Sequence, residues 1–179
     1  MSRLLTHLLH TPLATRRAFP AMVQESIRHA IHEGEQSHHG EIRFVVEGDW
    51  PLADVWSGKT VRARALEIFG LSRVWDTAGN TGILVYVLLC EHKVEILADR
   101  GLGDAIGPQV WHQLCDEMMA AYRAGRFEEG SVTLVPEAMR HPIEHTAHQP
   151  HHQRGGPGVV DVLAEQEASG YHAQANQQH

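Results

Sequence analysis

The stretch that decides the fold is TAGNTGILVYVLLC, residues 77–90. A polar loop rich in Gly and Asn leads here into an apolar run, residues 83–90, that contains no charge, Pro or Gly. An apolar run this short, bounded by turn residues, predicts a strand buried on both faces. After the polar break at 91–93, residues 94–98 partly alternate between apolar and polar. The two runs therefore predict a β-hairpin at the centre of a sheet.

The rest of the chain predicts helices around this hairpin and one further strand. Alternation predicts the strand over residues 41–46, and apolar residues recur at helical spacing over 19–34, 56–69, 108–122 and 132–140. In the helix at 56–69 we expect Val61, Ala65, Leu66 and Phe69 on the buried face. This order predicts an α/β fold: an α/β/α sandwich on a small mixed β-sheet, with helices on both faces. The strand at 41–46 should lie parallel to the one at 83–90.

Composition predicts three regions: a lead-in with a short amphipathic helix at 1–17, an α/β domain at 18–140, and a His-rich, Gly/Pro-containing flexible tail at 141–179. Within the tail, residues 159–167 are compatible with one short helix. The formal charge of -7 gives no overall basic field for nucleic acid or an anionic membrane. No apolar run is long enough for a transmembrane segment and no signal peptide is evident, so we expect a cytoplasmic protein.

Polar residues flank the open end of the predicted hairpin. Asp76 and Asn80 precede its first strand, and Asp99 follows its second. Because the entry and exit of an antiparallel hairpin lie side by side, we expect these three residues at one rim of the sheet. Glu47 or Asp49, from the loop after the strand at 41–46, are further candidates for this rim. Carboxylate and amide oxygens suit Ca²⁺ or Mg²⁺, although Asp and Asn also favour turns for their own backbone hydrogen bonds.

Arg64 and Arg100 are the cationic candidates, because Arg can bind phosphate through two parallel hydrogen bonds. The alternative is that both are ordinary solvated or ion-paired side chains. The tail carries His145, His148 and His152 at helical spacing, but Pro150 interrupts a continuous helix. We interpret these histidines as a source of adventitious metal affinity rather than a specific site. The sequence contains no nucleophile elbow, P-loop, H-E-x-x-H or C-x-x-C motif.

Four segments, at 62–69, 75–86, 94–101 and 125–130, together resemble the TPM-domain family, whose members are often labelled TPM phosphatases. The resemblance covers residues 18–140 and implies an α/β/α sandwich. It also implies acid phosphatase activity in some members and Ca²⁺ binding by the loops at this rim in others. The chain resembles the short, unanchored bacterial kind. It departs from the family pattern at Gly79, where an acid often stands, and at Thr81, which is inserted before Gly82.

The leading hypothesis from the sequence is weak, metal-assisted phosphomonoester hydrolysis. Asp76 and Asp99 would be the catalytic residues and would hold the metal together with Asn80, while Arg64 or Arg100 would bind phosphate. The rival is a non-catalytic interaction module, linked to maintenance of the cell envelope or of membrane proteins. It would bind a protein partner, such as a membrane-associated one, through the same rim or the N-terminal helix.

Overall fold

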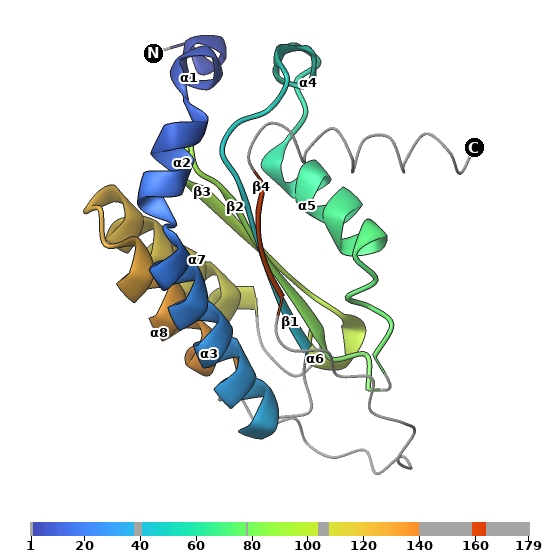
Figure 1. Ribbon diagram of the computed structural model, residues 1–179. Coiled ribbons are helices and arrows are strands. Elements are labelled where there is room, and N and C mark those ends of the chain that lie inside the picture. Colours follow the sequence, from blue (N-terminus) through green and yellow to red (C-terminus); the bar gives the residue numbers. More distant parts are fainter. Residues whose placement is uncertain (1, 38–40, 78, 104–107, 140–158, 164–179) are drawn as a thin grey trace.

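The computed structural model describes residues 2–37, 41–77, 79–103, 108–139 and 159–163. Within these residues the chain forms a four-stranded mixed sheet with the strand order β3-β2-β1-β4. Helices cover both faces of this sheet (Figure 1). The strands are β1 (Glu41–Glu47), β2 (Gly82–Leu88), β3 (Lys93–Ala98) and β4 (Val159–Leu163). The predicted α/β sandwich on a mixed sheet is confirmed.

The central strand β2 pairs with both of its predicted neighbours. It runs parallel to β1, with Val85 opposite Phe44, and antiparallel to β3, with Val85 opposite Ile96. All seven residues of β2 are buried. This burial explains why the strand is an uninterrupted apolar run, since a strand covered on both faces has no solvent-facing positions.

One face of the sheet is covered by α3 (Ala21–Ser37), α7 (Pro108–Arg123) and α8 (Phe127–Met139), and the other by α5 (Val61–Leu71) (Figure 1). The remaining helices are α1 (Arg3–Leu9), α2 (Pro12–Ala18), α4 (Leu52–Trp56) and α6 (Arg100–Gly103). Two hydrophobic cores result, one on each face. Val85 and Val87 belong to the core under α3 and α7, while Leu84 and Leu88 belong to the core under α5. Successive residues of β2 therefore serve opposite layers of the sandwich.

The expected helix at 56–69 is divided into two. Gly58 has a φ of 78° and ends α4, and Thr60 then starts α5 by accepting a hydrogen bond from the Ala63 amide at 3.1 Å. The expected buried face of this helix was also partly wrong. Leu66 is 54% exposed, whereas Arg64 is 2% exposed and lies in the interior.

A second correction concerns the C-terminal region. Residues 159–163 form the edge strand β4 rather than the start of a short helix, and Val160 lies opposite Phe44 in a parallel pairing with β1. The β-branched residues of this segment favour a strand once an edge is available for pairing. The rest of the predicted tail, including His145, His148 and His152, lies outside the described residues.

Candidate functional site

Two glycines allow the loops at the start of β2 to approach the sheet closely. A Cβ on Gly82 would lie 1.9 Å from the Val74 carbonyl oxygen, and one on Gly101 would lie 2.4 Å from the Gly79 carbonyl oxygen. The Gly101 amide also donates a hydrogen bond to the Asn80 carbonyl at 2.9 Å. The loop at 72–81 is thus in backbone contact with the turn into α6, and we call this junction the rim.

Asp99 is the most constrained acidic residue of the rim. Its amide donates to the Gly82 carbonyl at 2.8 Å, next to the last pair of the β2–β3 ladder. Its Oδ1 accepts a hydrogen bond from the Arg100 amide at 2.7 Å. Its Oδ2 is buried and has no hydrogen-bond partner among the described residues. A buried carboxylate oxygen without a donor is costly, and such an atom in a folded protein calls for an explanation.

The structure places Asn80 and Asp99 at the same rim, and Asp76 belongs to the loop that forms it. Asn80 is exposed and has a φ of 51°, and Asp76 is also exposed. Arg100 follows Asp99 directly and is exposed in α6. Among the residues that the structure describes, no group of three or more His, Cys, Asp or Glu side chains is arranged to hold a metal ion. The rim offers two carboxylates and one amide instead.

Glu47 does not belong to this rim. Asp49 follows Glu47 by two residues and so leaves the same end of β1. Because β1 and β2 run parallel, the end of β1 lies beside the end of β2, and Glu47 is opposite Leu88. The rim lies at the start of β2, six residues away, which is about 20 Å along a strand. The expectation that Glu47 would contribute to the rim was therefore wrong, because it overlooked the direction of the parallel pair.

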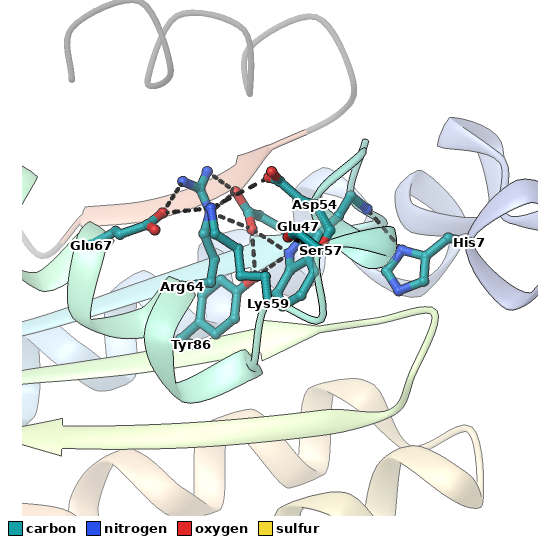
Figure 2. Close-up of polar contacts among 9 residues, drawn as sticks. His7, Glu47, Asp54, Ser57, Lys59, Arg64, Glu67 and Tyr86 are labelled. Carbon is teal, nitrogen blue, oxygen red and sulfur yellow. Dashed lines mark hydrogen bonds and ion pairs between the residues drawn. The ribbon is translucent and has the colours of Figure 1, made fainter. Parts of the chain in front are cut away.

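Glu47 is instead the centre of a buried polar network at the opposite end of the sheet (Figure 2). The Nε of Arg64 lies 3.1 Å from both carboxylate oxygens, and its Nη2 lies 2.5 Å from Oε1. The indole Nε1 of Trp50 donates to Oε2 at 3.0 Å, and the hydroxyl of Tyr86 donates to the same oxygen. Each of these four residues is at most 4% exposed. Every carboxylate oxygen in this network has donors, as a buried charge requires.

The groups of this network shift one another's pKa values. Burial alone would lower the pKa of Arg64, but the hydrogen bonds and charge of Glu47 outweigh it and raise that pKa above its ordinary value. Burial, followed by the charge of Glu47, raises the pKa of the Tyr86 hydroxyl well above its usual range. Arg64 also donates to Glu67 at 3.1 Å. The structure thus separates Arg64 from the rim and pairs it with two carboxylates.

His7 extends the polar end of the sheet to α1. The Trp50 amide donates to His7 Nδ1 at 2.9 Å, so the ring hydrogen is on Nε2, which lies 2.7 Å from Glu91. Burial would raise the pKa of Glu91, but hydrogen bonds from His7, Lys93 and Arg3 lower it to about 2. The neighbouring Cys90 has its thiol pKa raised to about 12, by burial and then by the nearby carboxylates of Glu91 and Asp49.

These surroundings argue against a Cys–His nucleophile. The Cys90 sulfur lies 3.5 Å from His7 Nδ1, but that nitrogen already accepts a hydrogen bond and the thiol stays protonated at neutral pH. Sequence reasoning assigned no role to His7, although its position as a polar residue within an apolar N-terminal patch was a local signal. Ligands of open α/β sheets usually bind beyond the carboxyl ends of the parallel strands. Here that end is filled by paired side chains, so the rim is the better candidate site.

Comparison with known proteins is consistent with the fold. The sequence model of the TPM-domain family matches residues 16–141 of the chain. The chain is also similar to the BA42 protein of the psychrophilic bacterium Bizionia argentinensis, solved by NMR, with a TM-score of 0.58 and 24% sequence identity. That similarity covers 66% of this chain and 77% of the BA42 chain, and at this identity it supports the fold alone. No curated protein sequence matches the chain.

Proposed function

The chain belongs to the TPM-domain family, and on that premise we propose that its rim binds a divalent cation and supports weak phosphomonoester hydrolysis. The observation that carries the proposal is the buried Oδ2 of Asp99, which has no hydrogen-bond partner among the described residues. A cation at the rim would neutralise this oxygen and offset the cost of burying it.

The donor groups at the rim fit Ca²⁺ or Mg²⁺. Asp76 and Asp99 supply carboxylates, Asn80 supplies an amide oxygen, and the Gly79 and Asn80 carbonyls approach Gly101. Such hard oxygen ligands suit these two cations better than transition metals. When bound, a cation of this kind polarises a phosphoryl oxygen and stabilises the charge that develops there.

Arg100 is the phosphate-binding residue of this proposal. It is exposed, and it follows Asp99 directly in the chain, so its guanidinium is accessible to a phosphate held near that carboxylate. Arg64 has no part in the proposed site, because its guanidinium is buried against Glu47 at the other end of the sheet. In the proposed reaction Arg100 orients the phosphate, and the acidic pair positions the cation.

The test combines a binding and an activity measurement. Titration calorimetry with Ca²⁺ and Mg²⁺ is compared for the wild type, Asp99→Asn and Asp76→Asn, and p-nitrophenyl phosphate hydrolysis is followed with Ca²⁺, Mg²⁺, Mn²⁺ or EDTA. Asp116→Asn, on the exposed surface of α7, is the matched control. We expect the two rim variants to lose cation binding and cation-dependent turnover, and the control to retain both. Binding that is equal in all four proteins would refute the rim as the site.

A non-catalytic interaction module is the second candidate function. Two described thiols, Cys90 and Cys115, have pKa values raised to about 12 and about 11, chiefly by burial, so neither supplies a thiolate at neutral pH. In this alternative the rim binds a membrane-associated protein involved in cell-envelope maintenance. Cation binding without any turnover, together with a protein captured by the wild type but not by an Asp76→Ala/Asp99→Ala variant, would favour it over hydrolysis.

A further inference from the structure

Helix α1 presents an apolar stripe to solvent. Leu5, Leu8 and Leu9 are spaced three and four residues apart and are 48%, 62% and 68% exposed. The opposite side of the helix faces inward, where His7 is buried and Leu4 packs against the core under α5. An amphipathic helix of a globular protein normally buries its apolar stripe. Here the larger part of that stripe remains uncovered in the described structure.

Helix α4 carries further exposed apolar side chains. Leu52 and Trp56 are one helical turn apart and exposed, and Trp56 is 81% exposed, while Val55 between them is buried. Helices α1 and α4 are in contact, and both lie at the same end of the sandwich (Figure 1). We call the exposed apolar side chains of these two helices, Leu5, Leu8, Leu9, Leu52 and Trp56, the apolar end. It gathers five of the nine large hydrophobic side chains that are exposed in the described structure.

Polar contacts on the inner side of α1 hold the apolar end in place. The Arg3 Nε donates to Glu91 at 2.6 Å, and its guanidinium lies 5.1 Å from the centre of the Trp50 ring. His7 is fixed between the Trp50 amide and Glu91, as described above. Because these contacts orient the helix, the leucines are presented to solvent without the ordering cost that a free segment would carry on binding.

The N-terminal segment that contains α1 is basic, unlike the chain as a whole. The formal net charge is -7, yet residues 1–24 contain no Asp or Glu. Arg16 and Arg17 are exposed in the last turn of α2, and the Asp54 carboxylate of α4 is paired with Lys59. Exposed Leu and Trp beside basic residues are the features of helices that lie in the headgroup region of a membrane.

We propose that the apolar end binds peripherally to an anionic phospholipid bilayer. Leu8, Leu9 and Trp56 enter the headgroup boundary, and Arg16 and Arg17 contact lipid phosphates. A search of the described residues finds no helix whose length and apolar character would let it cross a bilayer, so the contact is with the surface. The proposal is independent of the activity proposed for the rim. Since α6 and the rim lie at the opposite end of the sheet, the bound domain holds the rim away from the membrane (Figure 1).

The lipid test uses the full chain and two kinds of vesicle, phosphatidylcholine alone and phosphatidylcholine with phosphatidylglycerol. We expect co-sedimentation with the anionic vesicles only, weakened by added salt. Trp56→Ser and Leu8→Ser/Leu9→Ser should abolish it. Arg16→Gln/Arg17→Gln should weaken it by about fivefold for each arginine. Trp75→Ser is the matched control, because Trp75 is a half-exposed tryptophan in the loop of the rim and should leave binding unchanged.

Thermal unfolding of each variant shows whether it is folded, and the substituted side chains point outward, so we expect unchanged transitions. Equal sedimentation with neutral and anionic vesicles would overturn the charge argument. Wild-type binding that persists in Trp56→Ser and Leu8→Ser/Leu9→Ser would overturn the assignment to the apolar end. Absence of vesicle binding, with self-association or a protein partner lost in these same variants, would refute the lipid surface as the occupant.

Discussion

Glu47 and Asp99 lie at opposite ends of the same sheet, and their carboxylates have contrasting surroundings. Both oxygens of Glu47 accept hydrogen bonds, from Arg64, Trp50 and Tyr86. Asp99 has a backbone donor on Oδ1 and none on its buried Oδ2 among the described residues. A buried carboxylate whose donors all come from its own chain contributes to the fold. One that lacks a donor leaves a position that a ligand can fill, which is why we place function at the rim.

The largest effect is expected from the Arg64→Met substitution, which tests whether the Glu47 carboxylate depends on its partners. It leaves the Glu47 carboxylate buried without its cationic partner, and we expect the free energy of unfolding to fall by about 3–5 kcal/mol. Urea denaturation measures the change. Arg62→Met is the control, because Arg62 is exposed and its ion pair with Glu95 is long, at 3.5 Å, and it should change stability by less than about 0.5 kcal/mol. Similar changes in the free energy of unfolding at the two positions would mean that burial of the Glu47 carboxylate does not depend on Arg64.

The close backbone contact at the rim predicts a smaller effect. Gly101→Ala places a Cβ against the Gly79 carbonyl oxygen, so the loop must move, and we expect a loss of about 1–3 kcal/mol. Gly70→Ala is the matched control, because a Cβ there meets nothing within 4 Å in an exposed part of α5. It should raise stability by up to about 1 kcal/mol. Thermal unfolding distinguishes the two, and a neutral Gly101→Ala would show that the rim is not tightly joined.

The smallest expected effect concerns pH. The pKa of Glu91 is lowered from 4.5 to about 2 in the folded state, so its stabilising contribution is complete above about pH 4.5 and is lost as the pH falls toward 2. After allowance for solvent screening, Glu91→Gln should cost about 1 kcal/mol at pH 7. The stability difference between the wild type and this variant should shrink as the pH falls below 4.5 and vanish below about pH 2. A difference that is constant from pH 7 to pH 2 would contradict the assigned ionisation.

The sheet was predictable from the sequence because its signals are local. The apolar run at 83–90, bounded by turn residues, is enough to indicate a strand covered on both faces. Strand β4 was not predictable, because residues 159–163 carry a short mixed pattern whose conformation depends on pairing with β1. Edge strands of this kind are determined by a distant partner rather than by their own periodicity.

The buried polar network around Glu47 was not predicted from the sequence, for a related physical reason. In α5 the buried face contains Val61, Arg64, Ala65 and Ile68. A hydrophobicity pattern prefers Leu66 to Arg64, since an arginine is buried only when a partner neutralises it. That partner, Glu47, lies 17 residues away on another element. The rim residues were easier to find, because the two strands of a hairpin bring their flanking residues together by simple geometry.

The pairing of β4 with β1 leaves an edge of β1 open during synthesis of the chain. Of the strands in the described part of the chain, residues 41–98 contain three, and β4 is the last of these to leave the ribosome. Until it arrives, residues 43–47 of β1 have one edge without a pairing partner from the described sheet. Open strand edges are templates for aggregation. A chain truncated after residue 140 would keep this edge permanently open, so expression as a shortened domain should favour insoluble protein even though most of the core is present.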